Sequence, residues 1–319
     1  MLITNSSYKK PGWPNGEHLE TIIPSLFRRV KVSPSSQEQI NTPDDDFLDL
    51  DWYKVDSDKL IIVSHGLEGS SESQYATGIA KYFNSKGIDA ICWNYRGCSG
   101  KMNKQLRFYH SGATDDLEVI IKHAITTGYT NIGLVGFSLG GNVTLKFLGE
   151  APKKYNEIKT AAVFSVPLHL SSGCDEISRP KNKIYANRFL RKLKYKIREK
   201  HKIMPDKLPL NGLQSVNTLR DFDDMYTGPL HGFENAEDYY QKSSAIFFLD
   251  KISVPTLLVN ALNDPFLPDL CYPFEQLKEH TYVYFEAPDH GGHVGFRPAA
   301  ADGSFWSERR AYEFIAERL

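Results

Sequence analysis

Short apolar runs that alternate with segments of helical spacing constrain this chain more than any other feature. The runs have the length and composition of buried strands. We expect them at residues 60–63, 90–93, 132–135, 161–166, 256–259 and 282–285. Apolar residues recur at helical spacing in residues 75–86, 115–126, 142–149 and, at the end, 306–319. Strand and helix in alternation predict an α/β protein with a mostly parallel sheet and helices on both of its faces.

Two earlier segments are expected to add an antiparallel edge to the sheet. Residues 47–55 partly alternate between apolar and polar side chains, and residues 26–32 are a second candidate strand. The sheet would then have about eight strands. No long linker rich in Pro, Gly or Ser interrupts the 319 residues, so we expect a single domain over residues 1–319.

An unusually long connection precedes the strand at 256–259. About ninety residues follow the strand near Val163, whereas a connection between strand and helix normally needs few. We expect an inserted helical lid at residues 170–245. Within it, residues 179–202 carry eleven Lys or Arg and place Leu190, Leu193 and Ile197 at helical spacing. A basic amphipathic helix can lie on a membrane surface, but a solvated lid helix with its apolar stripe on the core is favoured.

The pentapeptide Gly136-Phe137-Ser138-Leu139-Gly140 lies between a predicted strand and a predicted helix. In that context Gly-x-Ser-x-Gly forms a nucleophile elbow, in which a serine hydroxyl stands exposed on a sharp turn. The glycines are required because the turn packs strand against helix closely. Ser138 would lie at a helix N-terminus, where free amides favour an oxyanion.

A serine hydroxyl becomes a nucleophile only when a base takes its proton and a carboxylate orients that base. Asp264 follows a predicted strand and is the best carboxylate, while Asp269 and Asp250 are weaker candidates and an Asx turn is the structural alternative. His290 and His293 compete as the base in the glycine-rich loop after the last strand.

The second donor of an oxyanion hole is expected in the loop after residues 60–63. The glycines around Leu67 let that loop bend toward the elbow, so the amides of Leu67 and Leu139 are the predicted donors. Four residues are candidate contacts to the substrate: His65, Phe137, Arg96 and His110.

These blocks together resemble the α/β-hydrolase superfamily and, more narrowly, its YheT-like branch, which includes yeast medium-chain alcohol acyltransferases and animal lipid hydrolases. The resemblance covers most of the chain: residues 15–21, with Glu20 where the branch has Gln, residues 65–70, 94–100 and 109–112, and single positions from Asp223 to Asp264. The resemblance implies an α/β-hydrolase fold under a helical lid. It also implies Ser138, Asp264 and His293 as the catalytic triad.

Residues 110–115 fit the His-x-x-x-x-Asp pattern of some acyltransferases. We favour a structural interpretation, because Asp115 suits the first turn of a helix. Arg107, like Arg96, is a further candidate to bind a carboxylate of the substrate, although loop arginines more commonly form salt bridges within the protein.

The remaining features argue against other classes of partner. The net charge of −1 and the pI of about 6.8 do not favour nucleic acid, and no apolar stretch reaches the length of a membrane span. We expect a cytoplasmic protein with a small ester substrate and no cofactor. We also expect no metal, because the histidines lack the spacing of zinc hydrolases. Four cysteines without paired spacing are expected to be reduced.

The leading hypothesis is a serine hydrolase that cleaves carboxylic esters with short- to medium-chain or lipid-like acyl groups. An alcohol O-acyltransferase would use the same acyl-enzyme. A ligand-binding protein with a silent site is a remoter alternative.

Overall fold

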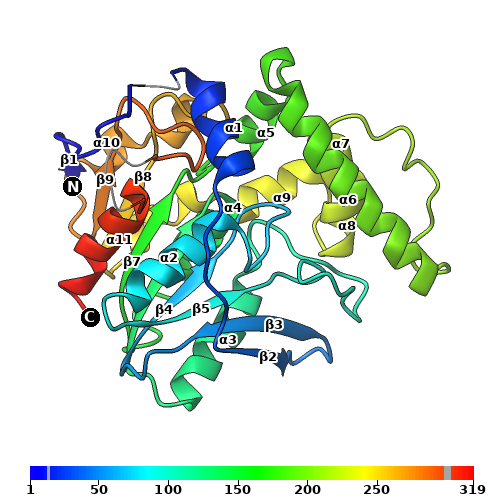
Figure 1. Ribbon diagram of the computed structural model, residues 1–319. Helices are drawn as coiled ribbons and strands as arrows, with labels where there is room; N and C mark the ends of the chain where they lie inside the picture. Colours follow the sequence, from blue (N-terminus) through cyan, green and yellow to red (C-terminus); the bar gives the residue numbers. More distant parts are fainter. Residues whose placement is uncertain (13–14, 298–302) are drawn as a thin grey trace.

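A computed structural model describes residues 1–12, 15–297 and 303–319, and among these residues nine strands form one sheet (Figure 1). Their order across the sheet is β1-β9-β8-β7-β6-β4-β5-β3-β2. The strands are β1 Leu2–Ile3, β2 Ser36–Asn41, β3 Phe47–Tyr53, β4 Lys59–Ser64, β5 Asp89–Trp93, β6 Asn131–Phe137, β7 Ile158–Phe164, β8 Thr256–Val259 and β9 Val283–Glu286.

The sheet is parallel except at one edge, where β3 pairs antiparallel with both β2 and β5. The mostly parallel α/β architecture is therefore confirmed. One strand prediction was wrong: residues 26–32 form no strand, because Leu26 and Phe27 complete the apolar spacing of helix α1 (Glu17–Phe27). The edge position belongs instead to β2, which forms a hairpin with β3. The two-residue β1 was not predicted and brings the total to nine.

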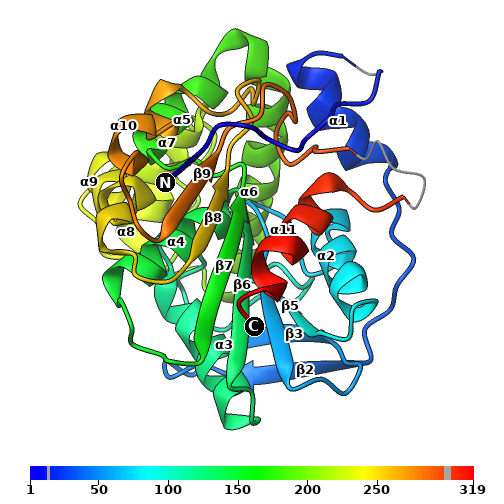
Figure 2. The same cartoon turned by 90° about the vertical axis from the view of Figure 1, so that its left-hand side faces the viewer.

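Alternating side chains of the central strands build one core on each face of the sheet. In β4, Leu60 and Ile62 contribute to one core and Ile61 and Val63 to the other. Helices α2 (Gln74–Asn84) and α11 (Trp306–Ala316) cover the second face, whereas α3 (Thr114–Thr126) and α4 (Leu139–Glu150) cover the first (Figure 2). Buried continuous apolar strands of this kind require helices on both faces.

The chain between β7 and β8, residues 165–255, contains helices and no strand. Its main helices are α5 Leu170–Ser178, α6 Lys183–Ile203, α7 Leu219–Phe222, α8 Gly228–Leu230 and α9 Ala236–Ser243, and a short helix α10 (Phe274–Leu277) follows β8. We call residues 170–245 the helical insertion. Across the described residues, no helix is both long and apolar enough to cross a membrane. The four cysteines are free thiols, as the sequence predicted.

The carboxyl ends of β4, β6, β8 and β9 meet at one edge of the sheet, because these strands run parallel and lie close together in the sheet. The loops that follow them carry His65, Ser138, Asp264 and His293. Ligands bind at this edge in open α/β sheets. The topology thus gathers residues that are distant in sequence.

Candidate active site

The backbone at Ser138 has the strained geometry of a nucleophile elbow. Its φ of 52° and ψ of −118° place a non-glycine residue where L side chains are rarely found, at the N-cap of α4. A Cβ atom on Gly136 would lie 2.6 Å from the Gly140 carbonyl oxygen, and one on Gly140 would lie 2.3 Å from the Ser64 carbonyl oxygen. Both neighbours of the turn must therefore be glycine.

The structure brings Ser138, His293 and Asp264 into one hydrogen-bonded chain. His293 Nε2 lies 3.0 Å from Ser138 Oγ, and His293 Nδ1 lies 2.8 Å from Asp264 Oδ2. The Asp264 side chain is fully buried and that of His293 is 10% exposed. These distances and roles are those by which a catalytic triad is recognised. In the part of the chain that the structure describes, neither Asp250 nor Asp269 forms a hydrogen bond or ion pair with His293, and Asp250 accepts a bond from Gln276 instead.

Contacts from three parts of the chain fix the loop that carries His293. Its amide donates to Thr21 Oγ1 at 2.9 Å, and the Val294 amide donates to Ser165 Oγ at 2.8 Å. The ring of Phe266 lies against the imidazole, with centroids 4.2 Å apart. A fixed loop keeps the imidazole in the orientation that proton transfer requires. The sequence did not predict these positioning residues, although Thr21 belongs to the block at residues 15–21 that carries part of the resemblance.

The other candidate base, His290, contacts Glu20 and Asn263 and forms no hydrogen bond with Ser138 among the described residues. The buried Glu20 carboxylate accepts bonds from the Gly291 amide and Asn263 Nδ2, at 2.9 and 2.8 Å. His290 Nδ1 lies 3.3 Å from the same carboxylate, and its side chain is 37% exposed. Glu20, the departure from the family pattern, thus ties α1 to the loop that carries both histidines.

The loop after β4 packs directly on the nucleophile. A Cβ on Gly66 would lie 3.3 Å from Ser138 Cβ, and Leu67 and Leu139 both line the cavity beside Ser138. Within the described part of the chain, no group accepts a hydrogen bond from the Leu67 amide. The loop is held by Tyr75, whose hydroxyl accepts from the Gly66 amide at 2.9 Å. This arrangement is compatible with the predicted oxyanion hole.

The helical insertion also contacts this loop. Lys192 Nζ donates to the Glu68 carbonyl oxygen at 2.9 Å, and Lys196 Nζ lies 2.7 Å from the Glu68 carboxylate. The hydroxyl of Tyr109 accepts from the Glu68 amide and donates to its carboxylate. Two lysines of α6 therefore hold the residue that follows the predicted oxyanion donor.

Three of the four predicted substrate contacts lie elsewhere. The His65 ring is buried, with Nδ1 2.7 Å from the Gly66 carbonyl oxygen, and burial lowers its pKa to about 3. Phe137 points into the second core and stacks on Phe164. Arg96 is buried among three aspartates. None of these three side chains lines a cavity that contains Ser138, because each satisfies packing or hydrogen bonds inside the domain.

His110, the fourth, does line the cavity beside Ser138. Its ring lies between those of His231, Phe233 and Tyr239, and burial lowers its pKa well below the usual value, so it is neutral. Asp115 pairs instead with Arg107 and is 55% exposed. The two residues of the acyltransferase-like pattern therefore have different partners, as the structural interpretation expects.

Arg96 stabilises the fold rather than the site. Its guanidinium lies 2.7 Å from Asp116, 2.8 Å from Asp44 and 3.0 Å from Asp46. We expect Arg96→Met to lower the free energy of unfolding by about 3–5 kcal/mol, because two buried carboxylates, Asp46 and Asp116, lose their closest cation. Urea denaturation measures the loss.

Arg107→Met is the matched control for Arg96→Met. The Arg107 side chain is 30% exposed and shares Asp44 and Asp116 with Arg96, so we expect a loss of only about 1 kcal/mol or less. Equal losses for the two variants would contradict a structural role specific to Arg96.

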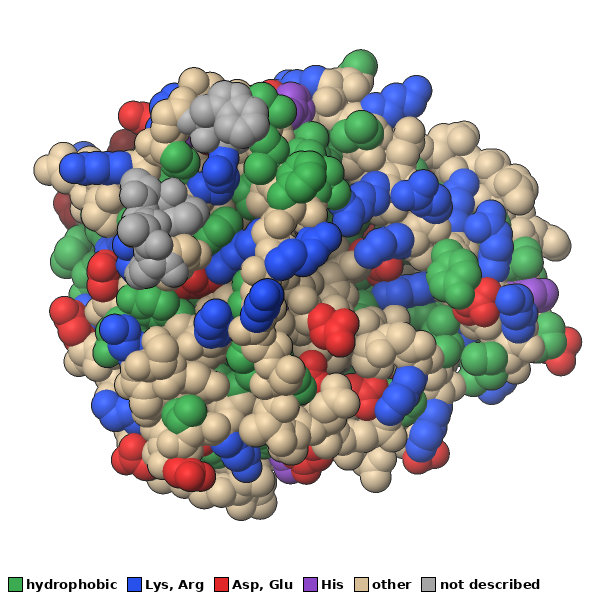
Figure 3. All heavy atoms as spheres, in the orientation of Figure 1, with side chains coloured by type: hydrophobic (Ala, Val, Ile, Leu, Met, Phe, Trp, Pro, Cys, Tyr) green, Lys and Arg blue, Asp and Glu red, His purple; other side chains and the backbone are tan. Residues whose placement is uncertain are grey.

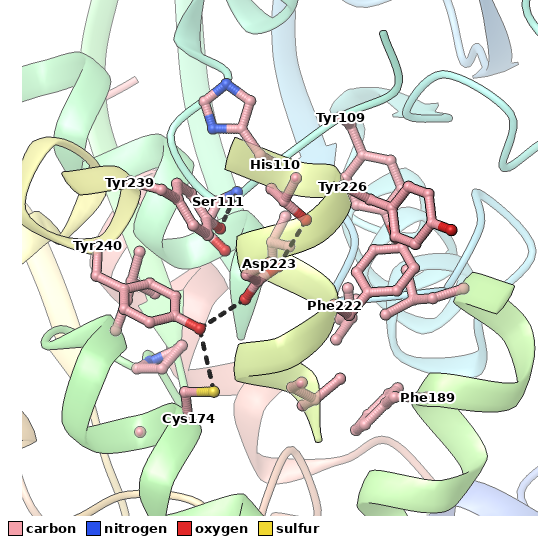
Figure 4. A pocket seen from close by; sticks show the side chains of 18 of the residues that line it. Tyr109, His110, Ser111, Cys174, Phe189, Phe222, Asp223, Tyr226, Tyr239 and Tyr240 are labelled. Carbon is pink, nitrogen blue, oxygen red and sulfur yellow. Dashed lines mark hydrogen bonds between the residues drawn. The ribbon is translucent and has the colours of Figure 1, made fainter. Parts of the chain in front are cut away.

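Two cavities meet at Ser138. The first measures about 150 Å³ and extends beneath the helical insertion between apolar side chains (Figure 4). They include Leu170, Ile177, Phe189, Leu193, Leu219 and Phe222. The second is an open groove of about 730 Å³ between α1, α6 and the loop after β4. Ser138, His293 and Leu67 border both.

A cluster of polar side chains borders part of the apolar cavity. Tyr240 donates to Asp223 at 2.7 Å and also contacts Cys174 Sγ, as the dashed lines of Figure 4 mark. Burial raises the pKa of Asp223 to about 6 and that of Cys174 to about 12. Cys174 is therefore a protonated, unreactive thiol at neutral pH. Among the described residues, no three His, Cys, Asp or Glu side chains converge to hold a metal ion.

The fold and the elbow together define an α/β hydrolase. A family model described as the alpha/beta hydrolase fold matches residues 59–297, and the chain belongs to that family. It is 36% identical to the Escherichia coli (strain K12) protein YheT, whose name marks it as an expected esterase, over 95% of this chain and 91% of that protein. The resemblance to the YheT-like branch is therefore confirmed.

Other relatives carry lipid-related names. Phospholipase ABHD3 of Bos taurus is 28% identical over 92% of this chain and 74% of its own length. The monoacylglycerol lipase of Saccharomyces cerevisiae is 28% identical over 80% of this chain and 58% of its own length. Among solved structures, an esterase of Pyrococcus furiosus matches with a TM-score of 0.59 at 17% identity, covering 89% of this chain and 91% of that one. That last similarity concerns the fold alone.

Proposed function

We propose that this protein hydrolyses carboxylic esters through an acyl-enzyme on Ser138. The observation that carries the proposal is the chain of hydrogen bonds from Ser138 Oγ through His293 to Asp264, at 3.0 and 2.8 Å. His293 takes the hydroxyl proton as Ser138 attacks the ester carbonyl, and then protonates the leaving alcohol. Water, activated by the same imidazole, releases the acid. Asp264 orients His293 and stabilises the imidazolium.

The amides of Leu67 and Leu139 are proposed to bind the oxyanion that forms during the attack. Both residues border the cavity at Ser138, and Leu139 begins a helix whose dipole favours negative charge there. The loss of one such donor typically costs on the order of 10²- to 10³-fold in rate.

The apolar cavity beneath the helical insertion is proposed to hold the acyl chain. Its volume of about 150 Å³ is below the range of roughly 300–1,000 Å³ typical of pockets for drug-sized ligands. This size favours short- to medium-chain acyl groups. The lipid-related names of the relatives support an acyl ester as the substrate class.

A series of p-nitrophenyl esters tests this assignment. We expect kcat/KM to rise from acetate to butyrate or octanoate and to fall for palmitate. Leu219→Trp narrows the cavity and is expected to lower kcat/KM for octanoate by roughly tenfold or more while acetate is little affected. Phe247→Trp, at an exposed residue outside the cavity, is the control. An equal loss of kcat/KM for the octanoate and acetate esters in Leu219→Trp would contradict the assignment of this cavity to the acyl chain.

Acyl transfer to an alcohol is a second candidate, because the open groove gives an acceptor alcohol its own route to Ser138. The two reactions share the acyl-enzyme and differ only in the acceptor. Products formed with added ethanol distinguish them: free acid alone excludes transfer, and an ethyl ester supports it.

A further inference from the structure

Large apolar side chains are exposed on both walls of the open groove that leads to Ser138. Leu26 and Phe27, at the end of α1, are 48% and 72% exposed, and Ile184, on the first turn of α6, is 70% exposed. Leu26 and Ile184 line the groove itself. The two helices are adjacent, since the His18 ring stacks on that of Tyr185. Single exposed apolar residues are ordinary, but a group around one opening marks an interaction site.

Cationic side chains surround the same opening. Arg188 and Arg191 line the groove, Lys183 is exposed at the start of α6, and Arg29 is exposed just after the end of α1. Within the described residues, no carboxylate lies within ion-pair distance of any of these four. Figure 3 shows Lys and Arg side chains along this face beside hydrophobic ones. The face is therefore positive although the whole chain has a net charge of −1.

Two acidic groups close to the groove, Glu17 and Glu68, are already paired. Glu17 lies 3.3 Å from His18 and 3.9 Å from Lys181, and the buried side chain of Glu68 is paired with Lys196. A third, Glu72, is exposed in the loop between Ser70 and Ser73 and forms no ion pair within the described residues, so four unpaired cations face one unpaired carboxylate.

We infer that this face docks on an anionic lipid surface. The docking face consists of Leu26, Phe27, Arg29, Lys183, Ile184, Arg188 and Arg191. The three apolar side chains would enter the boundary of the acyl region, and the cations would contact lipid phosphates, which is how amphipathic surfaces bind membranes. Nucleic acid would match the cations but would leave the exposed apolar group unexplained.

Docking in this orientation turns the mouth of the groove toward the lipid. An acyl ester then reaches Ser138 without crossing water, which lowers the cost of moving an apolar chain. This consequence rests on the proposed ester hydrolysis, whereas the docking itself does not.

Sedimentation with vesicles tests the docking. We expect binding to vesicles of phosphatidylcholine with phosphatidylglycerol, little binding to phosphatidylcholine alone, and release at high salt. Arg188→Glu with Arg191→Glu, and separately Phe27→Ser with Ile184→Ser, are each expected to weaken binding roughly tenfold or more. Circular dichroism checks that the variants fold.

The matched control changes an apolar and a cationic residue near the end of the sheet where the parallel strands begin, opposite the end that carries Ser138. Val55→Ser with Lys251→Glu alters exposed positions there and is expected to leave vesicle binding unchanged. Wild type that does not bind anionic vesicles, or that binds oligonucleotides but not vesicles, overturns the inference. Equal weakening of vesicle binding in the control and in the docking-face variants overturns it too.

Catalysis and docking fail separately in this design. Ser138→Ala removes the proposed nucleophile and is expected to bind vesicles as wild type does. If wild type binds vesicles but hydrolyses no ester, the proposed function is wrong and the docking face remains. If wild type hydrolyses esters without binding vesicles, the docking inference is wrong and the proposed function remains.

Discussion

Ser138→Ala is expected to lower ester hydrolysis by about 10⁴-fold or more. The hydroxyl that forms the acyl-enzyme is gone, and the neighbouring imidazole at 3.0 Å has no proton to accept. Loss of the whole triad mechanism leaves only the rate enhancement of binding and the oxyanion hole. Steady-state rates with p-nitrophenyl butyrate measure the effect, and a fluorophosphonate probe should label wild type but not the variant.

Ser85→Ala is the control for this substitution. Ser85 is exposed at the end of α2, and its hydroxyl donates only to the Tyr82 carbonyl oxygen. We expect wild-type rates and full labelling. A Ser138→Ala variant as active as wild type would refute the acyl-enzyme, and folded wild type that resists the probe would favour the ligand-binding alternative.

Asp264→Asn is expected to lower kcat by about 10³- to 10⁴-fold with little change in stability. The carboxylate accepts from His293 Nδ1 at 2.8 Å and from the Phe266 amide at 2.9 Å. An asparagine retains the shape but can present its amide to the imidazole, which then adopts the tautomer that cannot take the serine proton. Steady-state kinetics give kcat, and thermal unfolding checks the fold.

Asp269→Asn tests the weaker carboxylate from the same loop. Asp269 is exposed at the start of a short 3₁₀ turn, and its replacement should leave kcat unchanged. A large loss of kcat for Asp269→Asn and a small one for Asp264→Asn would show that Asp269, not Asp264, orients the imidazole.

The success of sequence reasoning at the elbow has a local cause. Strand β6, the turn at Ser138 and helix α4 are consecutive, so apolar spacing and two glycines define all three. The failures at His65 and Arg96 have the opposite cause. A polar side chain in a loop is easily taken for a site residue when its partners are not known. The partners of Arg96 lie on a β-hairpin and a helix, 20 to 52 residues away in the sequence.

The local pattern did not decide between His290 and His293, and only the resemblance favoured His293. Both residues follow β9 in a loop with glycines, and both have a carboxylate nearby in the fold: Glu20 for His290 and Asp264 for His293. Only the backbone path of the loop, set by Thr21 and Ser165, determines which ring faces Ser138.

The sequence alone determined the alternation of strands and helices, an antiparallel strand within residues 47–55, the turn that exposes Ser138 and the candidate triad residues. These features depend on side-chain periodicity and on contacts between near neighbours. The tertiary structure decided which candidates meet, that Arg96 is buried among aspartates, and that two cavities border Ser138. Ser138 and His293 are 155 residues apart. Contacts across such separations depend on sheet order and loop packing, to which every strand contributes and which no single segment encodes.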